Sequence, residues 1–180
     1  MINKTILFFR FAEYYIKFIQ EYQKQNVSLW GLTIVNEPIL SNKQPNYRFN
    51  SLAMNSTIQR DFLKYDFEPL LKKSNLDHLQ IMVYDGNIAN IEEYVNTVLN
   101  DNDAAKLAHG IAFHWYDNKV VDRKVISKIG QKFPNHFLIS TESCEMWKDE
   151  RDHVQLGSWN PAERYAEDII NGKYWSVMAS

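Results

Sequence analysis

Four short apolar runs, separated by segments whose apolar residues recur at helical spacing, constrain the fold of this 180-residue chain most strongly. The apolar runs are 27–35, 79–84, 110–114 and 137–140. The helical segments are 8–25, 57–73, 91–99, 103–109, 120–133 and one that begins at Asn160, with Pro161 in its first turn. Repeated helix and strand units predict a parallel sheet covered by helices, either an open doubly wound sheet or part of a barrel.

Polar or aromatic side chains come directly after each apolar run, at 36–37, 85–87, 114–116 and 142. The carboxyl ends of parallel strands meet at one rim, where barrel enzymes place their chemistry. No glycine-rich phosphate-binding fingerprint follows a run, which argues against a nucleotide site. The pattern therefore favours part of a (β/α)8 barrel. A complete barrel has eight strands and typically about 250 residues, so the chain corresponds to an incomplete one. Pro69 is expected to bend or split the helix at 57–73.

The composition indicates a globular chain that forms one domain or part of one, with 45% hydrophobic and 23% charged residues. The formal charge is −2, and mixed signs leave no basic face for nucleic acid or an anionic membrane. No apolar run approaches the about 18 residues that a membrane span needs. The apolar stretch 6–9 is broken by Arg10 and lacks a cleavage site, so we expect no signal peptide in this chain.

Two glutamates, Glu37 and Glu142, each follow an apolar run. Two carboxyl groups that face one pocket can break a glycosidic bond with retention of configuration, one as proton donor and the other as nucleophile. An ionised Glu142 would also disfavour ionisation of Glu37 and keep the donor protonated. The alternative is that both carboxylates are only solvated or salt-bridged at the ends of their strands.

Five ordered blocks resemble a known family. They are WGLTIVNEP at 30–38, QRDF at 59–62, HGIAFHWY at 109–116, TESC at 141–144 and LGSW at 156–159. Together they resemble the glucosylceramidases of glycoside hydrolase family thirty, almost from end to end of the chain. The resemblance implies a single incomplete barrel domain over residues 1–180, about strands four to seven with their helices. The accompanying β-sandwich domain of the family is absent from this match.

The resemblance assigns roles to individual residues. It implies that Glu37 is the acid/base, that Glu142 is the nucleophile, and that the Asn36 amide contacts the sugar 2-hydroxyl. Tyr116 would hydrogen-bond and orient Glu142. An alternative for Asn36 is that it only caps the turn after the strand.

Further residues are expected to line the sugar pocket or to contact the lipid. His114 and Trp115 would form the pocket wall, Tyr47 and Phe49 would meet the lipid or aglycone, and Asp85 matches an acidic residue of the family. Plain core packing is the alternative for the aromatic residues after the strand, and loop anchoring for Tyr47 and Phe49. The two residues after Asp85 depart from the family pattern, which affects the expected contacts with the leaving group.

The implied reaction needs no cofactor or metal, and no Cys/His cluster at ligand spacing occurs. The implied activity is hydrolysis of glucosylceramide to glucose and ceramide. A glycosphingolipid substrate, a sphingolipid activator protein and a lysosomal or secreted location are implied for the full-length enzyme. Asn3, Asn26 and Asn55 begin triplets that could accept glycans, and Cys144 is expected to be a partly buried, non-catalytic thiol. The alternatives are a non-catalytic truncated fragment, or a family member acting on another β-glycoside.

Overall fold

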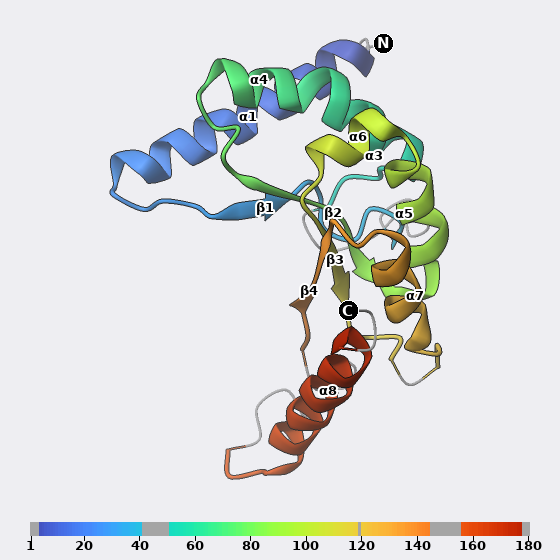
Figure 1. Ribbon diagram of the computed structural model, residues 1–180. Coiled ribbons are helices and arrows are strands. Elements are labelled where there is room, and N and C mark those ends of the chain that lie inside the picture. Colours follow the sequence, from blue (N-terminus) through green and yellow to red (C-terminus); the bar gives the residue numbers. More distant parts are fainter. Residues whose placement is uncertain (1–3, 41–50, 119, 145–155, 178–180) are drawn as a thin grey trace.

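The computed structural model describes residues 4–40, 51–118, 120–144 and 156–177. Its strands form one parallel sheet in the order β1-β2-β3-β4. The strands are β1 (Gly31–Thr33), β2 (Gln80–Asn87), β3 (Gly110–His114) and β4 (Phe137–Glu142). The sheet is curled, and Figure 1 shows its concave side free of helices. The prediction of an α/β fold with part of a barrel is confirmed.

Helices lie before, between and after the strands; those from α1 to α7 cover the convex side of the sheet, whereas α8 extends away from the sheet (Figure 1). They are α1 (Lys4–Lys24), α3 (Ser56–Phe62), η1 (Leu63–Phe67), α4 (Glu68–Lys73), η2 (Ile88–Asn90), α5 (Ile91–Leu99), α6 (Asn102–Leu107), α7 (Lys124–Lys132) and α8 (Asn160–Val177). Parallel neighbours require such crossovers, because a tight hairpin can join only antiparallel strands. Among the described residues, no helix has the length and apolarity to cross a membrane.

Several predicted boundaries were wrong. The first run, 27–35, forms a strand only over β1, because pairing with β2 stops at Thr33 and the chain then turns. β2 continues to Asn87 instead of ending at 84, since pairing with β3 resumes after a bulge. β4 extends to Glu142, and α7 begins at Lys124 instead of 120.

The predicted interruption by Pro69 is confirmed. The helical segment from 56 to 73 is divided into α3, the π-helical turn η1, and α4, which has Pro69 in its first turn. A proline lacks the N–H and crowds the carbonyl four residues earlier, and a wider π turn accommodates both effects. Phe62 and Phe67 flank the turn, and their buried rings stack with centroids 5.5 Å apart.

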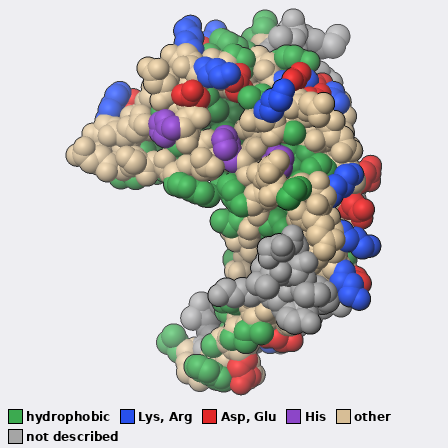
Figure 2. All heavy atoms as spheres, viewed as in Figure 1, with side chains coloured by type: hydrophobic (Ala, Val, Ile, Leu, Met, Phe, Trp, Pro, Cys, Tyr) green, Lys and Arg blue, Asp and Glu red, His purple; other side chains and the backbone are tan. Residues whose placement is uncertain are grey.

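The core lies between the sheet and its helices. Its largest fully buried side chains include Ile19, Phe62, Ile81, Tyr84 and Ile91. Figure 2 shows hydrophobic side chains along the hollow between the body of the molecule and α8.

Two glycines at the amino ends of the strands permit close packing. A Cβ at Gly31 would lie 2.4 Å from the carbonyl oxygen of Gln80, and one at Gly110 would lie 2.3 Å from the ring of Phe137. Contacts of this length are not sterically possible, so the strands reach this packing only without side chains at these two positions.

The three asparagines of the possible glycan triplets differ in their structural setting. Asn3 lies outside the described residues. Asn26 is exposed with a φ of 60°, and Asn55 is exposed as the N-cap of α3, where its side chain accepts a hydrogen bond from the Ile58 amide.

Candidate active site

A bulge in β2 positions the first acidic residue of the site. Tyr84 and Asp85 have φ values of 77° and 70°, and the register with β3 shifts between Tyr84 and Gly86. The freed amide of Tyr84 donates a 3.0 Å hydrogen bond to Oε1 of buried Gln59. Such bulges commonly re-aim a side chain at the rim of a barrel, and here the re-aimed side chain is Asp85.

Asp85 is buried and held by hydroxyl groups from both flanking sides. Thr33 Oγ1 donates to Oδ2 at 2.6 Å, and Thr141 Oγ1 donates to Oδ1 at 2.6 Å. His114 Nε2 lies 3.2 Å from Oδ1. Burial alone would raise the pKa of Asp85, but the contacts with His114, Thr141 and Thr33 outweigh it and hold the pKa below its ordinary value.

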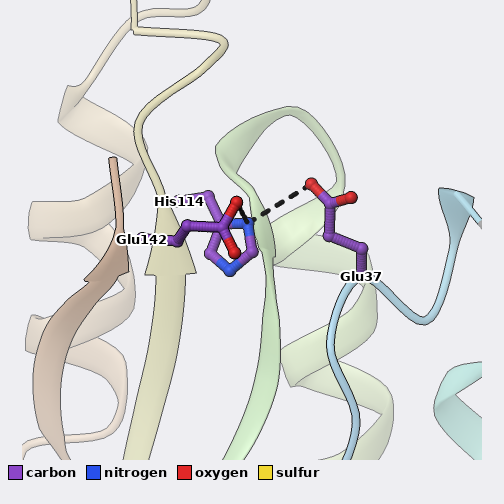
Figure 3. A group of neighbouring side chains, drawn as sticks. All are labelled: Glu37, His114 and Glu142. Carbon is purple, nitrogen blue, oxygen red and sulfur yellow. Dashed lines mark hydrogen bonds and ion pairs between the residues drawn. The ribbon is translucent and has the colours of Figure 1, made fainter. Parts of the chain in front are cut away.

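His114 occupies the centre of the site and is 0% exposed. Its other ring nitrogen, Nδ1, lies 3.3 Å from Oε1 of Glu37 and 3.9 Å from Oε1 of Glu142. Burial alone would lower the pKa of His114, but the hydrogen bonds with Asp85 and Glu37 outweigh it and raise the pKa to about 9. Figure 3 shows the two glutamates directed toward the imidazole from either side.

The two glutamates differ in their surroundings. Glu37 is buried, has a φ of 45°, and its amide donates a 2.9 Å hydrogen bond to the Asp85 carbonyl. The Glu142 side chain is 38% exposed and accepts a 2.9 Å hydrogen bond from the Tyr116 hydroxyl. Burial and contacts with Cys144 and Glu142 raise the pKa of Tyr116 above its ordinary value. The structure thus pairs one enclosed carboxyl group with one that solvent reaches.

One donor atom from each of Glu37, His114 and Glu142 lies within 4.8 Å of the others. A metal ion could bridge this spacing, but a metal requires a neutral imidazole. The raised pKa of His114 means that a metal ion bound here would have to displace a proton from the ring.

The other predicted site residues are Asn36, Trp115, Tyr47 and Phe49. Asn36 is half-buried, and its carbonyl accepts a hydrogen bond from Ser51. Trp115 is buried and stacks on Tyr165 of α8, with centroids 5.0 Å apart and an interplanar angle of 10°. Tyr47 and Phe49 lie outside the described residues. Cys144 is exposed, not partly buried as predicted.

Sequence reasoning missed three residues that shape the site, Thr33, Thr141 and Gln59. Thr141 directly precedes Glu142, and Thr33 lies inside the apolar run before Asn36, so their positions carried a weak signal. Gln59 opens the QRDF block at 59–62, but that block gave no sign that its side chain meets Tyr84, because this contact depends on the fold.

A cavity of about 110 Å³ adjoins Glu37. Its lining residues are Glu37, Pro38, Ile39, Leu40, Tyr84, Gly86, Asn87, Asn90 and Asp117. The loops that follow β1, β2 and β3 all contribute to it.

Residues 3–179 match the family model described as the glycosyl hydrolase family 30 TIM-barrel domain. The chain belongs to glycosyl hydrolase family 30. Its family 30 relatives include the lysosomal acid glucosylceramidase of Mus musculus, which is 33% identical over 92% of this chain and 32% of its own length. The endo-1,6-β-D-glucanase BGN16.3 of Trichoderma harzianum is 28% identical over 86% of this chain and 28% of its own length.

A solved structure shares the fold. The crystal structure of SrfJ from Salmonella typhimurium superposes with a TM-score of 0.73 at 23% identity, over 88% of this chain and 33% of that one. The family 30 chain therefore spans about a third of the proteins that it matches, and its described strands form half of the eight-stranded barrel.

Proposed function

We propose that this family 30 chain carries the catalytic centre of a retaining β-glucosidase of the glucosylceramidase type, with Glu142 as nucleophile and Glu37 as general acid/base. One observation carries the proposal: an oxygen of Glu37 and an oxygen of Glu142 lie within 4.8 Å. Retaining enzymes separate the two carboxyl groups by about 5 to 5.5 Å, whereas inverting enzymes need about 6.5 to 9.5 Å to admit a water.

The surroundings of the two carboxyl groups support these roles. Glu142 is the more exposed and is held by the Tyr116 hydroxyl, which leaves it open to attack the anomeric carbon. Glu37 is enclosed and faces His114, which suits a group that must hold a proton, deliver it to the leaving oxygen and later take one from water.

The substrate we propose is the β-glucosyl bond of a glycosphingolipid, supported by the similarity to mouse lysosomal acid glucosylceramidase. On the same basis, the proposed location of the complete protein is the lysosome, with an activator protein presenting the lipid. Asn36, Trp115 and Asp85 are proposed to support sugar binding, directly or through their neighbours.

A β-glucan is the second candidate substrate, and the similarity to a fungal endo-1,6-β-D-glucanase favours it. The two candidates share the carboxylates and differ in the leaving group. Parallel assays with glucosylceramide in detergent micelles and with a β-1,6-glucan separate them.

The test of the chemistry is hydrolysis of a fluorogenic β-glucoside by the purified chain, with mass detection of the adduct formed by a 2-fluoro-glucoside. We expect an adduct on Glu142 that is absent from Glu142→Gln. For Glu37→Gln we expect loss of turnover of the fluorogenic substrate. A folded chain with neither turnover nor adduct would contradict catalysis by these 180 residues and favour a non-catalytic fragment.

A further inference from the structure

We propose that Glu37 and His114 share a single proton along the line from Glu37 Oε1 to His114 Nδ1, and that Asp85 is the positioning residue that fixes it there. The inference extends the proposed function, in which Glu37 must hold a proton.

A neutral His114 ring carries too few hydrogens to serve both of its carboxylate contacts. Both ring nitrogens of His114 lie against carboxylate oxygens, at 3.2 Å for Asp85 and 3.3 Å for Glu37. A neutral imidazole has one N–H, and an ionised carboxylate only accepts hydrogen bonds. With His114 neutral, one of the two contacts therefore needs a proton on the carboxyl side.

Asp85 is not the side that is protonated. Its two oxygens already accept hydrogen bonds from Thr33 and Thr141, both at 2.6 Å, which favours the ionised form. Asp85 therefore accepts a hydrogen bond from His114 Nε2–H, and this contact selects the imidazole tautomer that carries its hydrogen on Nε2. The contact at Nδ1 is left with one proton, either on Glu37 as O–H or on His114 as N–H.

The other charged groups facing the ring favour the same proton. Glu142, from β4, lies 3.9 Å from Nδ1, and the ring of Tyr116 contacts the imidazole edge-on at 6.1 Å. Negative charge comes from three strands or their following loops, through Glu37, Asp85 and Glu142. Among the described residues, the ion pairs of these carboxylates are all with His114, and none is with a lysine or arginine. A proton between Glu37 and His114 reduces this repulsion.

The shared proton has a definite part in the proposed reaction. It moves to Glu37 Oε1, the O–H bond breaks, and the proton passes to the glycosidic oxygen as the C–O bond breaks and Glu142 bonds to the sugar carbon. Glu37 is then ionised beside the lone pair of Nδ1. When water attacks the sugar carbon, the bond to Glu142 breaks and Glu142 leaves as a carboxylate, while Glu37 takes the water proton, which restores one proton to the pair.

The decisive experiment is an NMR titration of the chain with ¹⁵N-labelled histidine, which does not depend on activity. We expect the His114 ring to stay protonated at Nε2 throughout and to lose its Nδ1 proton only near pH 9. In Glu37→Gln this step should move down by about one pH unit, and in Asp85→Asn by more. The ring signals of exposed His78, a residue outside the site, serve as the internal control.

A wild-type His114 that titrates below pH 7, at the same pH in Glu37→Gln, would overturn the proposal. If Asp85→Asn does not fold, Thr141→Val tests the same residue, because it removes the hydrogen bond from Thr141 to Asp85 without removing a charge. In Thr141→Val, the pH at which His114 loses its Nδ1 proton should move down by less than in Asp85→Asn.

Kinetic measurements on His114→Gln test whether the reaction uses the shared proton. In this variant the side-chain amide can donate to Asp85 in place of Nε2, but no nitrogen lies beside Glu37. His114→Gln should lower kcat for a glucoside with a basic leaving group about tenfold more than for 2,4-dinitrophenyl glucoside, which needs little proton donation. Equal losses on both substrates would contradict proton delivery. A chain that shows the NMR behaviour without turnover supports the shared proton and contradicts the proposed function.

Discussion

A histidine stands at each end of β3, and the two are built for opposite charge states. His109, just before the strand, accepts a 3.1 Å hydrogen bond from the Ile81 amide at Nδ1. Burial is the main cause that lowers the pKa of His109, and the charge of the neighbouring His136 is a smaller one. His114, at the end of the strand, lies among carboxylates and has its pKa raised to about 9. Burial disfavours the charged ring at both positions, so the partners decide the outcome.

The difference extends to the whole sheet. The amino ends of the strands are packed closely at Gly31 and Gly110, whereas the carboxyl ends carry buried acidic groups and positive φ values at Glu37 and Asp85. Strain and buried charge commonly concentrate at functional sites. We therefore expect changes at the carboxyl ends to alter chemistry and changes at the amino ends to alter stability.

The largest effect expected is on chemistry alone. Glu142→Gln should lower turnover of an aryl β-glucoside by about 10⁴-fold or more, because it removes the proposed nucleophile. The thermal midpoint should stay close to that of the wild type, since the side chain is 38% exposed. Steady-state kinetics and calorimetry measure the two. A large loss of stability in Glu142→Gln would contradict the expectation that changes at the carboxyl ends of the strands alter chemistry and not stability.

The converse prediction concerns stability alone. Gly31→Ala should lower the free energy of unfolding by about 3 kcal/mol, because its Cβ meets the backbone oxygen of Gln80 at 2.4 Å. Gly110→Ala is the matched variant and should cost about 1 kcal/mol, since the obstacle there is a ring that can shift. Urea unfolding gives both values. Equal costs would show that the β1 backbone moves freely.

The two histidines predict opposite pH dependences of stability. The folded pKa of His114 lies above its unfolded value, so its contribution is complete below about pH 6.5 and is lost as the pH rises through about 9. The loss should be on the order of 2 to 3 kcal/mol and should be absent from His114→Gln. The folded pKa of His109 is lowered, so its contribution is lost as the pH falls below about 6.5.

Thermal unfolding from pH 5 to 10 checks both directions. His109→Asn is the matched control, because an amide oxygen can accept from Ile81 without titrating. Asp85, whose pKa is lowered, adds a loss only at still lower pH. A wild-type chain that gains stability from pH 7 to 9 would contradict the assignment for His114.

The smallest effect concerns the exposed carboxylate. Tyr116→Phe removes one hydrogen bond to Glu142 and should cost about 1 kcal/mol, or roughly fivefold in the rate of adduct formation with the 2-fluoro-glucoside. Tyr65→Phe, on an exposed ring far along the chain, is the control. An unchanged adduct rate would mean that Tyr116 does not orient Glu142.

Local patterns predicted the alternation of helices and strands along the chain and the position of Glu37 and Glu142 after strands, because apolar runs and helical spacing are properties of short segments. They did not predict the β2 bulge or the hydroxyls on Asp85, because these contacts join Thr33 and Thr141 to a residue more than 50 positions away. Trp115 was expected on the pocket wall. Its stacking on Tyr165 depends on where α8 packs, and the residues near Trp115 in the sequence do not predict that position.

The π-helical turn η1 also fixes how this part of the chain can change in length. Its wider turn lets Phe62 and Phe67, five positions apart, point to the same side and stack. Deleting one residue between them would leave the two rings four positions apart, which is the spacing at which side chains share one face of an ordinary α-helix. Buried Leu71 would then keep its place in the core. A single-codon deletion here, of a residue as exposed as Tyr65, would therefore act within the turn and leave the buried face of α4 unchanged.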